Sequence, residues 1–187
     1  MSRGVALRRP LAPALGIDVS GALNLSGRLL KYFGLAYVFP ILVGLGYGDS
    51  VWPFAAAGAL TAAAGLALER LTGGGEQIGA REGFLVVSLT WALCALSVAV
   101  SYLLGEPQLR NPIDAYFEAM SGMTTTGASV LTDIPALDQT MALWRQFTQW
   151  LGGMGIVVLG LAILPRLRVG GRQLVESEMP GFEYEPL

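Results

Sequence analysis

Four long apolar segments limit what this chain can fold into more than any other feature. Each holds about 18–24 residues, and a helix of that length, rising ~1.5 Å per residue, extends roughly 27–36 Å. This matches the hydrocarbon core of a bilayer. The segments are Leu29–Gly48, Val51–Leu68, Gly83–Leu104 and Met141–Leu164. The sequence therefore predicts an all-α integral membrane protein with four transmembrane helices.

Composition supports the membrane class and argues against several others. Hydrophobic residues make up 53% of the 187 residues and charged residues only 14%, too few charges to cover a soluble domain of this size. The net charge of −2 predicts no nucleic-acid partner. Histidine is absent, which excludes a histidine-ligated zinc or haem site and leaves no nucleophile–base pair for an enzyme. Cys94, the single cysteine, is expected to be a small buried hydrophobe.

Lysine and arginine orient the predicted helices. With four spans, ten of the twelve basic residues fall on one side and only Arg110 and Arg145 on the other. The positive-inside rule then predicts that both termini are cytoplasmic and that residues 105–140 lie outside. The ten are Arg3, Arg8, Arg9, Arg28, Lys31, Arg70, Arg81, Arg166, Arg168 and Arg172.

The stretch between the third and fourth apolar segments contains a short predicted helix, "NPIDAYFEAMSGM". Asn111 is a good N-cap, Pro112 suits the first helical position, and Asp114 and Glu118 favour the first turns. Four apolar residues recur at helical spacing: Ile113, Tyr116, Phe117 and Met120. We expect about 11 residues of helix, ~16 Å long, ending at Ser121–Gly122. Such a helix can enter a membrane without crossing it.

The polar run "TTTGAS" follows this helix directly. Non-helical backbone inside a membrane is tolerated only where it is buried in protein or lines a watery cavity. Its carbonyl groups can replace the water shell of a dehydrated cation, with Gly127 supplying a backbone conformation that other residues avoid. The alternative is an ordinary extracellular loop. On these residues alone both interpretations stay open.

Other residues allow two interpretations each. "WLGGMG" (150–155) indicates packing of helices through small residues, a hinge, or a close seat for the short helix. We expect Arg145 to snorkel to the membrane surface; a role at the outer mouth is the alternative. Acidic residues of the outer region can attract cations or simply cap helices and be solvated: Asp114, Glu118, Asp133 and Asp138. Three aromatic residues suit interfacial belts: Trp52, Trp144 and Tyr102.

Long motifs of this chain resemble the Trk/Ktr/HKT superfamily of potassium transporters, and most closely its bacterial TrkH branch. They are "DAYFEAMSGMTTTGASVLTDI", "WRQFTQWLGGMGIVVLGLAILP", "VGGRQLVESEMPG" and, less strongly, "REGFLVVSLTW". The resemblance implies four helix–pore loop–helix repeats in one chain, arranged as a pseudo-tetramer around a potassium pathway. An extra helix pair precedes the first repeat, which fits Leu29–Leu68.

The resemblance also implies the parts of a site. The selectivity filter maps onto the backbone carbonyls of Thr124, Thr125, Thr126, Gly127 and Ala128, and the pore helix onto Pro112, Asp114, Glu118, Ser121 and Gly122. Potassium is the transported ion, and no covalently bound cofactor is expected. The expected partners are membrane lipid, the remaining three repeats, a second copy in a homodimer, and a cytoplasmic nucleotide-binding regulatory subunit. The expected location is the bacterial inner membrane.

The predicted organisation contains only the first of the four repeats. It comprises a cytoplasmic tail (1–28), a transmembrane hairpin (29–68), a cytoplasmic loop (69–82), one helix–pore loop–helix repeat (83–170) and a segment leading toward a second repeat (171–187). One filter strand cannot surround an ion. We therefore expect a fragment of a longer potassium-uptake protein. The alternatives are four assembled copies, or a non-conducting membrane interaction module left from a truncated transporter.

Overall fold

The structure is a computed structural model that describes residues 18–73 and 80–177, with side chains for 18–73 and 82–158. All regular structure in these ranges is helical. The elements are α1 (Val19–Phe33), the 3₁₀ turn η1 (Gly34–Tyr37), α2 (Val38–Tyr47), α3 (Trp52–Leu71), α4 (Ala80–Gly105), η2 (Pro107–Leu109), α5 (Pro112–Met123) and α6 (Gln139–Ser177).

Among the described residues, three helical stretches are long and apolar enough to cross a membrane: Val19–Tyr47, Trp52–Leu71 and Glu82–Gly105. They correspond to the first three predicted segments to within about one residue, except that the first begins at Val19 rather than Leu29 and the second extends to Leu71. Asp18 starts that helix early, because its carboxylate accepts a hydrogen bond from Gly21 N at 2.9 Å. The fourth segment, Met141–Leu164, is helical within α6.

A short 3₁₀ piece interrupts the first span at η1. Pro40 explains its position, because proline has no N–H to donate to the carbonyl of Ala36, and its ring crowds that carbonyl. The span ends at Gly48, whose φ of 78° reverses the chain into α3. A short turn thus joins α2 to α3, where the sequence predicted a hairpin.

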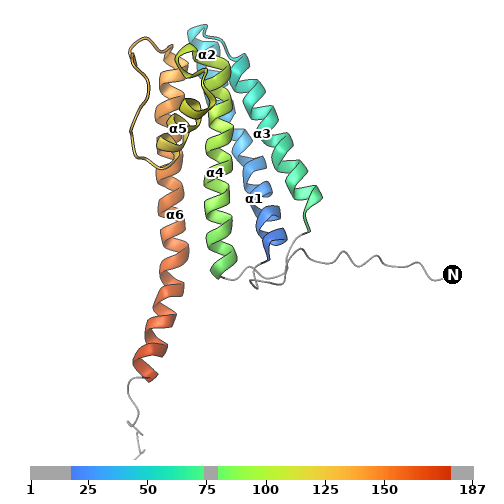
Figure 1. The fold of residues 1–187 in the computed structure, drawn as a ribbon, viewed down its shortest axis with the longest axis vertical. Coiled ribbons are helices and arrows are strands. Elements are labelled where there is room, and N and C mark those ends of the chain that lie inside the picture. The colour runs from blue at the N-terminus through green and yellow to red at the C-terminus, as the bar shows by residue number, and fades with distance from the viewer. Residues whose placement is uncertain (1–17, 74–79, 178–187) are drawn as a thin grey trace, which may run out of the picture.

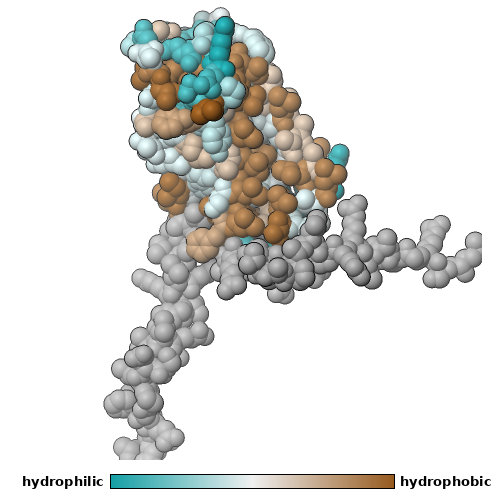
Figure 2. Space-filling view, in the orientation of Figure 1, coloured by the Kyte–Doolittle hydropathy of each residue, from teal (hydrophilic) through white to brown (hydrophobic). Residues whose placement is uncertain are grey.

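α1, α3 and α4 pack side by side, and α5 lies against α4 and α6 (Figure 1). α1 begins and α6 ends on the same side of the molecule, while the α2–α3 turn lies on the other. Apolar side chains cover the flank where α3 and α4 lie, and polar side chains gather at the end that carries the α2–α3 turn (Figure 2). This distribution suits a protein whose flank contacts lipid.

The core joins four elements around Trp144 of α6, which is 0% exposed. Its ring lies 4.7 Å from that of Tyr37 in η1 and 6.1 Å from that of Phe54 in α3. Its indole N–H donates to Ser101 Oγ of α4 at 3.0 Å. The prediction of an interfacial belt is therefore wrong for Trp144 and for Tyr102, which is also buried, because both face neighbouring helices. Trp52 remains largely exposed.

Glycine allows α1 and α3 to approach closely. A methyl group added at Gly65 would collide with the backbone N of Lys31, and it would lie 2.6 Å from the carbonyl oxygen of Gly27. Close approach through small residues is a general way to pack membrane helices. Across the same contact, the carboxylate of Glu69 pairs with Lys31 and Arg28.

We predict that Gly65→Ala destabilises the bundle by about 1–3 kcal/mol, because two backbones must separate to admit the methyl group. Gly46→Ala is the matched control, since it lies in α2 with no atom near its added methyl group. Thermal unfolding in detergent measures both. Equal unfolding temperatures for the two variants would contradict this account of the α1–α3 contact.

Candidate functional site

The predicted short helix is present as α5, which has 12 residues and ends at Met123 rather than at Ser121–Gly122. Its start follows the predicted signals. Asn111 Oδ1 accepts a hydrogen bond from Ile113 N at 3.0 Å, Pro112 takes the first position and Asp114 lies in the first turn. A helix of this length extends ~18 Å, about half the length of a membrane span.

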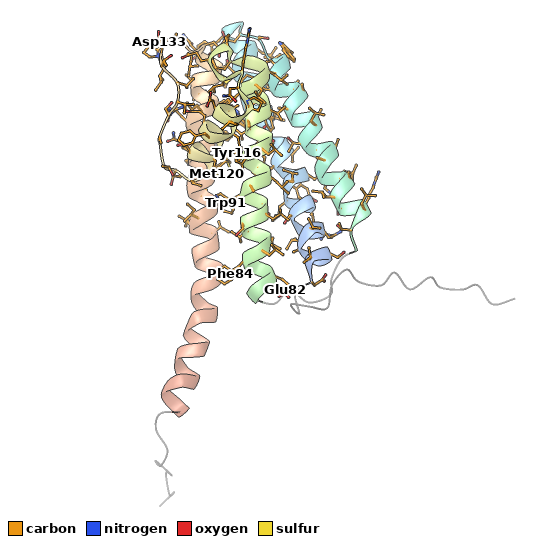
Figure 3. The ribbon with its side chains drawn as sticks, viewed as in Figure 1. Glu82, Phe84, Trp91, Tyr116, Met120 and Asp133 are labelled. Carbon is orange, nitrogen blue, oxygen red and sulfur yellow. The ribbon has the colours of Figure 1, made fainter. Side chains whose placement is uncertain are left out.

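α5 ends partway along the bundle. The indole N–H of Trp91, near the middle of α4, donates to the carbonyl of Met123 at 3.1 Å. Figure 3 shows Asp133 toward one end of the molecule and Glu82 at the far end of α4, with Met120 and Trp91 between them. The carboxyl end of α5 therefore lies at an intermediate depth between the two ends of α4.

The last four carbonyls of α5 are all hydrogen-bonded, although a helix end normally leaves them without helical partners. Three accept from backbone N–H groups of the following threonines, and the fourth accepts from Trp91. The pairs are Thr124 N to Met120 O (2.9 Å), Thr126 N to Ser121 O (2.9 Å), Thr125 N to Gly122 O (2.9 Å) and Trp91 Nε1 to Met123 O (3.1 Å).

These bonds form a Schellman motif with Thr125 in the left-handed position, at a φ of 58°. Glycine usually takes this position, and a β-branched residue there is strained. Gly127 also has a positive φ, 75°, as the sequence predicted. Sequence reasoning placed Thr125 in the filter but did not predict its positive φ, because no local signal marks a threonine for this conformation.

Hydrogen bonding changes abruptly after Met123. The four carbonyls of residues 124–127 accept no hydrogen bond from any residue that the structure describes. Ala128 differs, because its carbonyl accepts from Ser121 Oγ at 2.6 Å. The sign of φ alternates along this stretch, positive at Thr125 and Gly127 and negative at the residues beside them.

The buried face of α5 is not the apolar face that the sequence indicated. Ile113 is 77% exposed and Phe117 is also exposed. The buried stripe consists mainly of small residues at helical spacing, namely Ala115, Ala119 and Gly122. It also contains one charged residue, Glu118. Small side chains let the backbone of α5 approach its neighbours. Of the large apolar residues, Ile113 and Phe117 point outward, while Tyr116 and Met120 pack partly against the core.

Glu118 is 1% exposed, so solvation at the mouth is the wrong interpretation for this residue. Its carboxylate accepts from Arg145 Nε at 2.5 Å, from Ser129 Oγ at 3.0 Å and from Val130 N at 3.0 Å. Arg145 is 8% exposed, so the expected snorkelling is wrong as well. Both predictions failed because a buried partner replaces water for each charge.

The remaining outer acids have local roles in the described residues. Asp138 caps α6 by accepting from Met141 N at 2.6 Å, and Asp133 accepts from Ala136 N at 3.2 Å in a turn. Gln108, in η2, holds the loop at Thr132 and Asp133 through its amide oxygen and nitrogen. Sequence reasoning did not single out Gln108.

The "WLGGMG" motif seats the end of α5. A methyl group at Gly152 would collide with the carbonyl of Met123, and one at Gly155 would lie 2.7 Å from the ring of Trp91. A methyl group at Gly122 would lie 2.8 Å from Thr148 Oγ1 of α6. The two compatible interpretations, small-residue packing and a close seat, therefore describe one contact.

Cation-binding side chains are not clustered in the described ranges: no group of three or more histidine, cysteine, aspartate or glutamate residues comes together there. Cys94 is free and buried, as expected of a small hydrophobe. The chemistry at the end of α5 is thus that of backbone carbonyls rather than of carboxylates or thiols.

Residues 53–185, more than half of the chain, match the sequence model of a family described as TrkH, cation transport protein. The chain belongs to the TrkH family. The resemblance seen in the sequence is therefore confirmed, and together with the three apolar spans it identifies a membrane-embedded protein.

Several curated TrkH-family proteins match over part of their length. The chain is 43% identical to the Trk system potassium uptake protein TrkH of Halomonas elongata over 162 residues, which are 85% of this chain and 33% of the relative. The TrkH of Escherichia coli is 46% identical over 105 residues, 56% of this chain and 22% of the relative. The Escherichia coli protein TrkG is 38% identical over 107 residues, again 22% of the relative. The chain thus spans about a third or less of these relatives' length.

We predict that Gly152→Ala loosens the end of α5, because the added methyl group would displace the Met123 carbonyl. Hydrogen–deuterium exchange should then accelerate at the amides of Thr124, Thr125 and Thr126, whose hydrogen bonds depend on that helix end. Gly153→Ala is the matched control, since its methyl group would meet only Thr125 Cγ2, at an ordinary 3.5 Å. Unaltered exchange in Gly152→Ala would show that Gly152 is not the seat.

Proposed function

We propose that this chain supplies one of four selectivity-filter strands of a TrkH-type, channel-like potassium uptake transporter. The observation that carries the proposal is the sequence of carbonyls at the end of α5. Four are paired within the protein, and the next four, at residues 124–127, accept no hydrogen bond from the described residues. Backbone oxygens that have no hydrogen-bond donor are suitable ligands for a dehydrated alkali cation.

The depth of this segment supports the proposal. Unpaired carbonyls within the membrane are tolerated only in protein or beside a watery cavity, and an ion pathway provides such a cavity. The carboxyl end of α5 directs its partial negative charge toward the same place. The Ala128 carbonyl already has a hydrogen-bond donor, so the proposed ion ligands are Thr124, Thr125, Thr126 and Gly127, with Ala128 as the far end of the strand.

The whole assembly belongs to the proposal as well. One strand leaves most of an ion's coordination shell open, and relatives more than twice as long as this chain have room for further repeats. Potassium is the proposed ion because the relatives are named potassium uptake proteins. We place the chain in the bacterial inner membrane with both termini cytoplasmic, on the basis of its lysine and arginine distribution. A homodimer and a nucleotide-binding regulatory subunit are the proposed partners.

A second candidate function is a non-conducting membrane interaction module. The share of the relatives that the chain spans favours it. Genomic DNA downstream of the codon for Leu187 separates the two: three further repeats would reject the module, and a stop codon would support it.

We predict that Gly127→Ala lowers the potassium-to-sodium uptake ratio about tenfold. The strain of ~1–2 kcal/mol that a side chain meets at positive φ would turn the neighbouring carbonyls away. Gly48→Ala is the matched control, because Gly48 has nearly the same φ, 78°, in the α2–α3 turn. Both variants are made in the complete reading frame that encodes this chain. Rubidium and sodium uptake are measured in cells without other potassium transporters.

Selective uptake at wild-type levels in Gly127→Ala would remove the filter assignment. Equal losses in the Gly127 and Gly48 variants would assign the effect to strain in general. Loss in the Gly127 variant alone is the expected result.

A further inference from the structure

The proposed filter strand is held at both ends, and its far end depends on one buried carboxylate. At the near end, the Schellman motif and the seat at Gly152 hold Thr124 and Thr125. At the far end, Ser121 Oγ binds the carbonyl of Ala128, and Glu118 binds the next two residues. We propose that Glu118, fixed by Arg145, is a positioning residue that sets the ion discrimination of this strand. The inference rests on the proposed function.

The bonds to Glu118 connect three separate parts of the molecule. Oε1 accepts from Arg145 Nε of α6 and from Ser129 Oγ, and Oε2 accepts from Ser129 Oγ and Val130 N. α5, α6 and the returning loop therefore meet at a single carboxylate. Both oxygens are occupied, and the group has almost no contact with solvent.

A displacement of the Glu118 carboxylate would also move the carbonyls of the proposed filter strand. Ser129 follows Ala128 directly, so its position fixes where the strand ends. The next side-chain anchor of the loop is Gln108, which holds Thr132 and Asp133. If Glu118 releases Ser129 and Val130, the stretch from Ala128 to Leu131 loses its bonds to α5 apart from that of Ser121.

Ion discrimination is more sensitive to such displacement than folding is. Sites that select by geometry require their groups within about 0.5 Å of the working position. The fold has other supports, among them the aromatic core around Trp144 and the α1–α3 contact. A positioning role therefore predicts altered selectivity in protein that still reaches the membrane in normal amounts.

Variants of increasing severity test this in the complete reading frame. Ser129→Ala removes a hydroxyl that donates to Glu118 and accepts from Leu131 N, whereas Glu118→Gln retains acceptor capacity but loses the charge that faces Arg145. We expect the potassium-to-sodium uptake ratio to fall roughly threefold or more in Ser129→Ala and further in Glu118→Gln. Ser129→Thr restores the hydroxyl and should restore the ratio.

The matched control for Glu118→Gln is Glu69→Gln. Glu69 also pairs with basic side chains, Arg28 and Lys31, but at the opposite end of the bundle. Its variant should keep the wild-type ratio. Uptake of each ion is divided by the amount of transporter in the membrane, because loss of folded protein alone lowers both fluxes equally and leaves their ratio unchanged.

Wild-type ratios in Ser129→Ala and Glu118→Gln, at normal membrane amounts, would overturn the positioning role. If Glu118→Gln does not accumulate, the Ser129→Ala and Ser129→Thr pair decides alone. An altered ratio in Gly127→Ala with unaltered ratios here would reject this inference and keep the proposed function. An unaltered ratio in Gly127→Ala would reject the proposed function itself.

Discussion

The structure depends on how the carbonyl groups at the carboxyl end of α5 find hydrogen-bond donors. A helix that stops partway along a membrane bundle presents carbonyls where lipid offers no donor. The threonine amides that fold back on the helix, and the indole of Trp91, pair all four of them. Gly152 brings α6 close enough to enclose this end. Because Trp91 and the threonine amides supply every donor at the helix end, the next carbonyls, at residues 124–127, are the ones that accept no hydrogen bond from the described residues.

Small residues and buried polar pairs act together in this bundle. Gly65 brings α3 into backbone contact with α1, and Gly152 brings α6 into backbone contact with the end of α5. Side chains beside these two contacts have little room to move. Some buried hydroxyls are paired between helical elements, as Tyr37 Oη and Ser97 Oγ are at 2.8 Å. Lipid does not drive helices together by the hydrophobic effect, so contact and hydrogen bonding must supply the specificity of packing.

Local signals predicted most of the helices, and tertiary contacts explain the failures. The N-cap Asn111, the turn at Gly48 and the apolar spans depend only on neighbouring residues, and sequence reasoning found them. The roles of Glu118 and Arg145 depend on which faces of α5 and α6 meet, and no local pattern states that. The buried stripe of α5 contains mainly small residues, so a search for large apolar residues found two exposed ones, Ile113 and Phe117, beside two that pack partly against the core. Trp144 was misplaced because an aromatic residue near a helix end suits a membrane interface and a protein core equally.

The neutralisation of Glu118 has a consequence for how the proposed filter would select. A single unpaired carboxylate acts on a cation 4 Å away with about 4 kcal/mol at an effective dielectric of 20, and it does so for any monovalent cation. Arg145 cancels most of that attraction, and the hydrogen bonds from Ser129 and Val130 occupy the remaining acceptor sites. The ligands left to an ion are neutral carbonyl dipoles, whose number and spacing depend on backbone geometry. In the proposed filter the buried acid therefore contributes position rather than charge.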